Sequence, residues 1–184
     1  VQVTQDGGKT WTNLTPSIVG MPKNAWVPQI HVSKTNAGEA FVIVNNYRQF
    51  DYKPYLFHTK DFGKTWESLV TGAQVGESNF TLAVAQDPEQ NKLLFLGTEN
   101  GLFVSIDAGK NWTTWTNDFP AGVPVMDLVI QPRESDLVIC TFGRALWVLD
   151  DIRPLRELAK SGEGALNATV KLFTPPEAYL ASLQ

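Results

Sequence analysis

The chain has 184 residues, of which 43% are hydrophobic and 18% charged, a balance typical of a globular protein and not of a disordered one. Its formal net charge of −4, with 15 Lys and Arg against 19 Asp and Glu, gives no basic footprint for nucleic acid. No apolar run approaches the roughly 20 residues that span a bilayer, and the single cysteine, Cys140, lies in an apolar run where we expect a buried, inert thiol.

An internal repeat organises the sequence. Residues 4–11, 59–66 and 105–112 share the pattern [ST]-x-D-x-G-K-[TN]-W. The aspartates of the three copies recur at intervals of 55 and 46 residues. A period of this length, with short β-rich runs in each unit, is typical of propeller blades with four strands each. We therefore predict an all-β fold of four-stranded antiparallel blades.

The units follow one another in chain order. Residues 1–16 are predicted to end one blade, and residues 25–70 and 78–116 to form two whole blades. In the first whole blade the alternation of apolar and polar residues predicts strands near 29–33, 40–45, 55–59 and 65–69. In the second it predicts strands near 81–86, 92–97, 101–106 and 111–114.

A degraded fourth copy closes the series at residues 124–173. Residues 94–107 align without gaps on 137–150, which places Asp150 at the position of the repeated aspartate. We expect a short helix over 152–160, a strand over 168–173 in place of the missing outer strand, and an exit connector over 174–184. The prediction is a partial propeller of about three to four blades with a short C-terminal helix.

Each repeated motif is predicted to be a hairpin between the third and fourth strands of a blade. The aspartate accepts backbone N–H groups of the turn, the glycine allows a positive φ, and the tryptophan folds back over the turn. Even spacing would spread the aspartates around a rim, too far apart for joint catalysis, so we assign no catalytic residue, metal site or cofactor. The residues assigned structural roles are Asp6, Gly8, Trp11, Asp61, Gly63, Trp66, Asp107, Gly109, Trp112 and Asp150.

These motifs resemble the BNR/Asp-box repeat, which sialidases, sortilin-type receptors, tandem-propeller xyloglucanases and photosystem-assembly propellers share. Residues 137–156 resemble the closing blade of large bacterial sortilin-like BNR proteins that are often labelled glycosyl hydrolases, and residues 172–179 resemble the connector after it. The resemblance implies an exported bacterial protein of the periplasm, cell surface or extracellular space. Because three blades and a remnant cannot close a ring, we expect the chain to be part of a larger propeller. Its first partners would then be further blades, from the same polypeptide or another chain.

One connection is much longer than its counterparts and has a composition typical of recognition surfaces. It covers residues 45–54, between the second and third strands of the first whole blade. The alternative is a flap that packs on its neighbour, with Arg48 paired to Asp51. With the residue at the equivalent place in the last blade, the candidate site for a glycan or protein ligand is Tyr47, Arg48, Asp51, Tyr52, Lys53 and Arg144.

An enzymatic reading is harder to support from the residues. A sialidase needs three clustered arginines, whereas Arg153 and Arg156 lie in the expected helix and Arg133 lies on the Asp-box side. Two sheet histidines, His31 and His58, lack neighbours at metal-ligand spacing. A glycosidase pair would have to be drawn from Asp51, Glu77, Asp118 and Asp127, among which no local motif selects two.

Three functions therefore stay open. The first is a non-catalytic binding segment of a larger exported propeller. The second is part of a glycoside hydrolase whose catalytic carboxylates are shared with other blades. The third is a structural scaffold in a cell-surface assembly.

Overall fold

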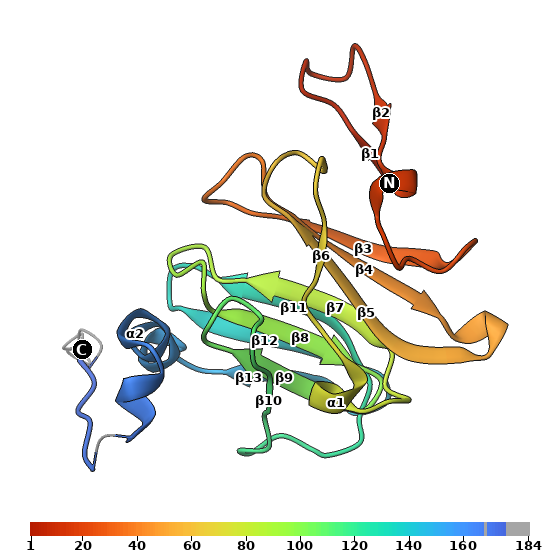
Figure 1. Cartoon of the computed structure of the whole chain (residues 1–184). Coiled ribbons are helices and arrows are strands. Elements are labelled where there is room, and N and C mark those ends of the chain that lie inside the picture. The colour runs from red at the N-terminus through yellow and green to blue at the C-terminus, as the bar shows by residue number, and fades with distance from the viewer. Residues whose placement is uncertain (168, 176–184) are drawn as a thin grey trace, which may run out of the picture.

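Four antiparallel sheets follow one another along the chain in a computed structural model that describes residues 1–167 and 169–175 (Figure 1). The first is a two-stranded hairpin of β1 (Gln2–Val3) and β2 (Thr12–Asn13). The second has four strands in chain order, β3 (Trp26–Val32), β4 (Ala40–Asn46), β5 (Asp51–Thr59) and β6 (Glu67–Ser68). The third is built in the same way from β7 (Thr81–Gln86), β8 (Leu94–Thr98), β9 (Gly101–Ser105) and β10 (Thr113–Thr114).

The fourth sheet has three strands among the described residues. They are β11 (Val125–Gln131), β12 (Asp136–Thr141) and β13 (Leu146–Leu149). The expected strand over 168–173 is not formed at residues 169–173, and residue 168 lies outside the described part of the chain. The fold is nevertheless the predicted one: all-β, with four-stranded antiparallel blades and a short helix after the last sheet.

The central strands of each sheet are buried on both faces because neighbouring sheets pack against them. All five residues of β8 are buried, as are six of the seven residues of β4. Apolar runs of this kind are typical of strands covered on both sides. Three buried clusters result, one in each layer between successive sheets.

Side chains of β3 also reach across to the edge of β7. Gln29 Oε1 accepts a hydrogen bond of 2.7 Å from the backbone N–H of Val84, and His31 Nε2 accepts one of 3.2 Å from that of Gln86. These bonds satisfy donors of an inner edge strand that has no strand partner on that side. His31 thus has the role of a hydrogen-bonded sheet histidine.

The sheets have two distinct ends. The Asp-box hairpins and the β3–β4, β7–β8 and β11–β12 turns lie at one end, called the box end below. The β4–β5, β8–β9 and β12–β13 turns lie at the opposite end, because successive strands run antiparallel. Figure 1 shows the β4–β5 hairpin projecting at this opposite end.

Short helices lie between the sheets, within the β4–β5 hairpin and after the last sheet. They are the 3₁₀ turns η1 (Thr15–Ser17), η2 (Tyr47–Gln49) and η3 (Glu163–Asn167) and the α-helices α1 (Gly72–Val75) and α2 (Arg153–Ser161). None of the helices among the described residues has the length and apolarity that a membrane crossing requires.

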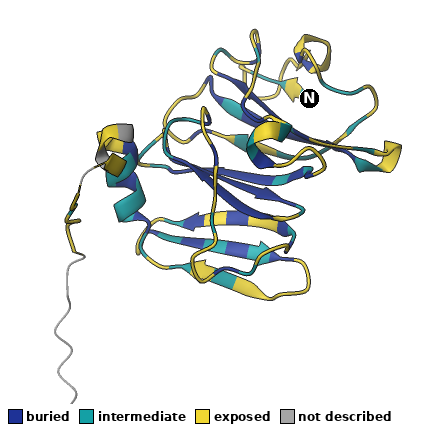
Figure 2. Cartoon of the chain, turned by 60° about the horizontal axis from the view of Figure 1, so that its bottom comes forward, coloured by how far each residue is buried: buried dark blue, intermediate teal, exposed yellow. Residues whose placement is uncertain are grey.

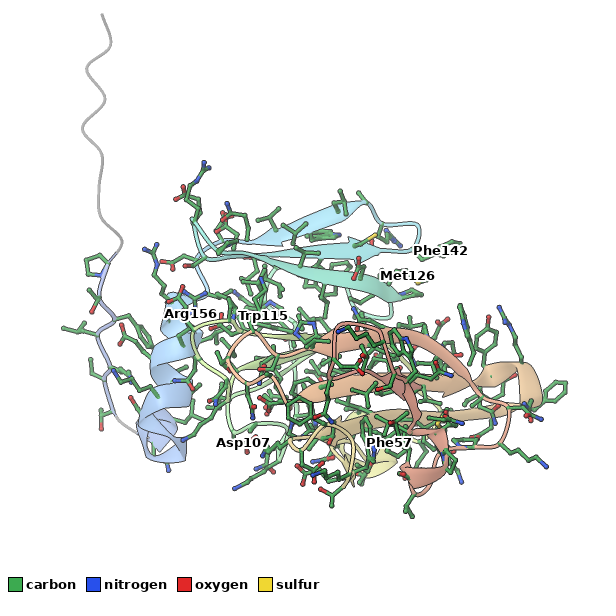
Figure 3. All side chains as sticks on the ribbon, turned by 90° about the horizontal axis from the view of Figure 1, so that it is seen from above. Phe57, Asp107, Trp115, Met126, Phe142 and Arg156 are labelled. Atoms are coloured by element: carbon green, nitrogen blue, oxygen red, sulfur yellow. The ribbon has the colours of Figure 1, made fainter. Side chains whose placement is uncertain are left out.

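Helix α2 is fastened to the box end of the third and fourth sheets. The guanidinium of Arg156 donates to Asp87 Oδ2 at 2.8 Å and to Ser135 Oγ at 2.9 Å, and lies 3.0 Å from Glu89 Oε1. Asp87 is fully buried and the Arg156 side chain is 10% exposed. Figure 3 shows Arg156 between the helix and the sheets.

The strand register of the fourth sheet differs from the ungapped alignment of residues 94–107 with 137–150. The backbone N–H of Ile152 bonds to Ser135 O, as that of Ala108 bonds to Lys92 O in the third sheet. The β12–β13 turn contains one residue more than the β8–β9 turn, so Asp151 stands where Asp107 stands, and Asp150 does not. An ungapped alignment cannot register such an insertion.

The outer face of the fourth sheet is open (Figure 2). Cys140 on β12 is half-buried there, which corrects the expectation of a buried thiol. Large apolar side chains are exposed on the strands of this sheet and in the turns beside them: Met126, Val129, Phe142, Leu146 and Val148. Exposed apolar surface of this extent is typical of a face that another element covers.

Candidate functional site

The Asp boxes are hairpins in which the carboxylate organises the turn. Asp61 Oδ1 accepts hydrogen bonds from the Thr65 backbone N–H and the Thr59 hydroxyl, both at 2.9 Å, and Asp61 Oδ2 accepts from the Thr65 hydroxyl at 2.6 Å. The side-chain bond from Thr65, followed by its backbone bond, lowers the pKa of Asp61 to about 2.

The other two boxes have the same bonding. Asp6 accepts from Thr4 and Thr10, and the Thr10 hydroxyl is the main reason that its pKa is lowered to about 2. Asp107 accepts from Ser105 and Asn111, and these bonds lower its pKa although burial opposes them. The three carboxylates are bonded to protein donors within their own turns, which accounts for their recurrence without a ligand.

The boxes also join neighbouring sheets. Trp112, the last residue of the third box, is buried and donates its indole N–H to Leu69 O at 2.8 Å. Leu69 follows the outer strand of the preceding sheet, and its side chain packs on Gly109 so closely that a Cβ there would lie 3.0 Å from Leu69 Cδ1. In the second box, a Cβ at Gly63 would overlap Leu14 Cδ1 in the same way.

Trp11 and Trp66 fold over their own turns, with indole bonds to Gly8 O at 3.1 Å and Gly63 O at 2.9 Å. Trp11 is 59% exposed, because no preceding sheet lies beside it among the described residues. Gly8 has a φ of +91°, in the region that favours glycine.

The long connection predicted over residues 45–54 is largely regular. Strand β4 extends to Asn46 and β5 begins at Asp51, so the connection is η2 plus Phe50, which has a φ of +60°. The two strands continue beyond the sheet as a hairpin, and a bulge lies between Val44 and Asn46. The polar composition of the segment had concealed this pairing.

Arg48 and Asp51 have separate partners, which corrects the pair expected for a packed flap. The guanidinium carbon of Arg48 lies 4.5 Å from the ring centre of Trp26 and 5.5 Å from that of Tyr47. Asp51 Oδ2 accepts from the Tyr55 hydroxyl at 2.8 Å and from the Asn46 amide at 3.1 Å. Burial together with the bond to Asp51 raises the pKa of Tyr55 to about 12, so Tyr55 stays a donor.

Aromatic rings extend this arrangement. Tyr47 stacks on Phe80 with ring centres 5.1 Å apart, and Tyr52 lies 6.4 Å from the same ring. Phe50 is 86% exposed at the tip of the hairpin. The resulting hairpin surface consists of Trp26, Tyr47, Arg48, Phe50, Tyr52 and Phe80.

Three of these residues were not among the predicted site residues. Trp26 and Phe80 precede or begin strands of two different sheets, and only the fold brings them to the hairpin. Their aromatic character shortly before a predicted strand was the one available signal. Of the predicted residues, Lys53 is exposed on β5, and Arg144 lies in the β12–β13 turn, on a sheet separated from the hairpin by the third sheet.

The four candidate carboxylates are dispersed. Asp51 is engaged with Tyr55, and Glu77 lines a cavity of about 200 Å³ together with Lys53. Asp118 lines a different cavity of about 250 Å³, whereas Asp127 is exposed on β11. The candidate arginines also have structural partners: Arg133 contacts Glu134, Arg153 contacts Asp151, and Arg156 contacts Asp87.

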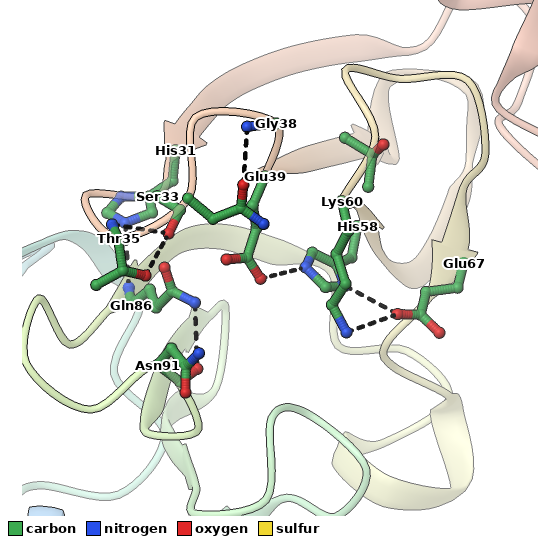
Figure 4. Close-up of polar contacts among 12 residues, drawn as sticks. His31, Ser33, Thr35, Gly38, Glu39, His58, Lys60, Glu67, Gln86 and Asn91 are labelled. Carbon is green, nitrogen blue, oxygen red and sulfur yellow. Dashed lines mark hydrogen bonds and ion pairs between the residues drawn. The ribbon is translucent and has the colours of Figure 1, made fainter.

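His58 lies at the centre of a cluster of titratable side chains on the second sheet and is only 2% exposed (Figure 4). Its Nε2 lies 2.8 Å from Glu39 Oε1 and its Nδ1 lies 2.9 Å from Glu67 Oε1, and its ring stacks on Phe41 at 4.4 Å. Lys60 approaches Glu67 at 4.0 Å. Both ring nitrogens have carboxylate partners, so the cluster is satisfied internally. Within residues 1–167 and 169–175, no group of three or more His, Cys, Asp or Glu could hold a metal ion.

Comparison with known proteins agrees with the repeat and the fold. Residues 2–13 match the family of the BNR/Asp-box repeat. A search of curated proteins finds no significant match.

Three solved structures are similar at the level of the fold. The GH74 enzyme of Niastella koreensis superposes with a TM-score of 0.54 at 20% identity, over 68% of this chain and 21% of that one. YCF48 bound to a D1 peptide gives a TM-score of 0.58 at 14% identity, over 82% and 44% of the two chains. The extracellular domain of a protein described as a one-component system from B. thetaiotaomicron gives 0.53 at 13% identity, over 76% and 17%.

The chain therefore spans less than half the length of each of these proteins. Three copies of one hairpin, the match at residues 2–13 and the arrangement of the sheets agree with one another. This chain is a series of β-propeller blades built on BNR/Asp-box repeats.

Proposed function

We propose that the chain is a non-catalytic binding segment of a larger exported propeller, and that the hairpin surface holds the ligand. The observation that carries this proposal is the guanidinium of Arg48, held over the rings of Trp26 and Tyr47. Stacking fixes the cation without consuming its hydrogen-bond donors. A ligand carboxylate or hydroxyl can therefore still bind to it.

The surroundings of Arg48 support recognition. Phe50 is exposed at the tip, and exposed aromatic side chains beside an arginine are typical of binding hot spots. Asp51 is turned to Tyr55 and Asn46, so its charge does not neutralise Arg48 directly. The ligand that fits is a protein segment or a glycan that offers an oxygen acceptor next to an apolar face.

The open face of the fourth sheet supports the proposal that the chain belongs to a larger propeller. Its exposed apolar side chains suit contact with a further blade of the same polypeptide or of another chain. An exported location is supported by the fold similarity to an extracellular domain.

The proposal is tested by nuclear magnetic resonance titration of the chain with two probes, an acidic peptide containing leucine and a cello-oligosaccharide. We expect one probe to shift the signals of Arg48 Nε–H and of the Phe50 and Trp26 rings. Phe50→Ala should weaken that binding about tenfold. The matched control is Phe142→Ala, since Phe142 is also exposed, at 73%, but lies on another sheet. If neither probe shifts these signals, or if both variants lose affinity equally, the hairpin surface is not the site.

A further inference from the structure

A tryptophan side chain fills the layer between the second and third sheets, but the layer between the third and fourth sheets has no equivalent side chain among the described residues. Between the second and third sheets, Trp112 fills the space beside Leu69, Val75 and Leu96. Strand β10 then follows directly and pairs with the outer edge of β9. The fourth sheet ends at β13 and has no such strand among the described residues.

Equivalent positions can be assigned from backbone hydrogen bonds. The N–H of Leu69 bonds to Leu56 O, and the N–H of Trp115 bonds to Leu102 O at the same place in the next sheet. Trp115 therefore stands where Leu69 stands, and its carbonyl is the counterpart of the acceptor that Trp112 uses. Figure 3 shows Trp115 close to the fourth sheet.

A cavity lies at this counterpart position. It has a volume of about 250 Å³. Its walls are residues 115 and 117–119, which follow β10, together with Ile139 of β12 and residues 147–150 of β13 and its end. It is smaller than the roughly 300–1,000 Å³ of ordinary small-molecule pockets, and its size suits a single large side chain.

The chain itself explains why the cavity is left open. Arg153 occupies the place that Gly63 and Gly109 have in the boxes, and it is followed by Pro154. The polypeptide continues into α2 at the box end and does not return along β13. The buried contacts of Arg156 with Asp87 and Ser135 hold it there.

We infer that this cavity and the outer edge of β13 form a binding site for an extended peptide in which an aromatic residue directly precedes the residues that pair with β13. The incoming strand would run antiparallel to β13 and pair with Val148 and Trp147. These two residues correspond to Val104 and Phe103, which pair with Thr113 and Thr114 of β10. The aromatic residue would enter the cavity and an indole would donate to Trp115 O, as Trp112 donates to Leu69 O.

The carboxylates at the rim of the cavity favour a positively charged peptide. Asp118 and Asp150 line it together with Asn117, and neither aspartate is buried. A basic residue shortly before the aromatic one would complement these carboxylates. The boxes of this chain carry such a lysine two residues before each tryptophan, for example Lys110 before Trp112. Strand addition to an open sheet edge supplies backbone hydrogen bonds, and the pocket supplies specificity.

The test uses the 184-residue chain and a synthetic peptide that copies residues 110–117, with a second peptide carrying alanine in place of Trp112. Calorimetry should show saturable binding of the first peptide and at least tenfold weaker binding of the second. Hydrogen exchange should slow at Leu146–Leu149 when the first peptide is bound, and not at the β4–β5 hairpin. The site is thereby separated from the hairpin surface.

Two protein variants sharpen the test. Asp150→Lys should weaken binding of the peptide by about threefold or more, whereas Glu134→Lys, the same reversal of charge at another exposed carboxylate in the β11–β12 turn, should leave it unchanged. The inference is overturned if the two peptides bind equally, if binding leaves the exchange of β13 unchanged, or if the free chain dimerises with β13 already protected. It is also overturned if a cello-oligosaccharide competes with the peptide.

Discussion

The indole N–H of Trp112 lies 2.8 Å from the carbonyl oxygen of Leu69, which is 43 residues earlier and belongs to the preceding sheet. The box of one blade thus fastens the outer strand of another. Removing the indole leaves a buried carbonyl without its donor and a cavity between two sheets.

We expect Trp112→Ala to lower the free energy of unfolding by about 3–5 kcal/mol. Trp11→Ala removes the same residue of the same motif at a place where it is 59% exposed, and should cost less than about 1 kcal/mol. Urea denaturation of both variants measures the difference. Similar losses for the two would mean that contact between sheets is not what Trp112 contributes.

The second box makes a steric prediction. Gly63 has a φ of +81°, and a Cβ there would overlap Leu14 Cδ1. Gly63→Ala should therefore destabilise by about 2–4 kcal/mol, through backbone strain and overpacking together. Gly7→Ala is the matched control, since its φ is +72° and nothing lies within 4 Å of the added Cβ. At Gly7 the substitution adds backbone strain alone, so the free energy of unfolding should fall by only about 1 kcal/mol.

Acid should weaken the boxes in a defined range. The pKa of Asp61 is lowered to about 2, mainly by the Thr65 hydroxyl bond, whereas an unfolded chain has a value near 3.9. Because the folded pKa is the lower one, the stabilisation is fully present above about pH 4 and is lost as the pH falls through about 2.

Nuclear magnetic resonance titration of the Asp61 carboxyl carbon checks the value directly. Thr65→Val removes the hydroxyl and should raise the pKa of Asp61, while that of Asp6 in the first box stays at about 2. An unchanged Asp61 pKa in this variant would exclude the hydroxyl bond as the main cause.

The ion pair beneath α2 is buried, and breaking it should be costly. Arg156→Ala leaves Asp87 fully buried without its cation, for an expected loss of about 3–5 kcal/mol. Arg133→Ala breaks a pair in which the arginine is 81% exposed and should cost at most about 1 kcal/mol. Hydrogen exchange at α2 in the Arg156 variant should accelerate, and an unaltered rate would show that other contacts hold the helix.

The repeats made most of the fold predictable. The three boxes mark the same hairpin in successive blades because the turn requires an aspartate and a glycine at set positions, and these requirements are local in the chain. Asp150 was assigned wrongly because a single inserted residue between β12 and β13 changes the register without changing the composition of either strand.

The candidate site was less predictable because it depends on distant segments. Arg48 and Tyr47 were identifiable from their own segment, but Trp26 and Phe80 come to them only when β3 and β7 are in place. The expected Arg48–Asp51 pair rested on proximity along the chain. In the structure, the hydroxyl of Tyr55 and the amide of Asn46 bind Asp51, and the ring of Trp26 attracts Arg48.

The route of the chain after β13 places the α2 segment and the hairpin surface at opposite ends of the sheets. Helix α2 and residues 169–175 lie at the box end, where Thr174 N–H bonds to Glu157 Oε1. The hairpin surface lies at the opposite end (Figure 1). Any element attached through the α2 segment would therefore lie at the box end and leave the opposite end of the sheets accessible. An attachment and a captured ligand could be accommodated together without steric competition.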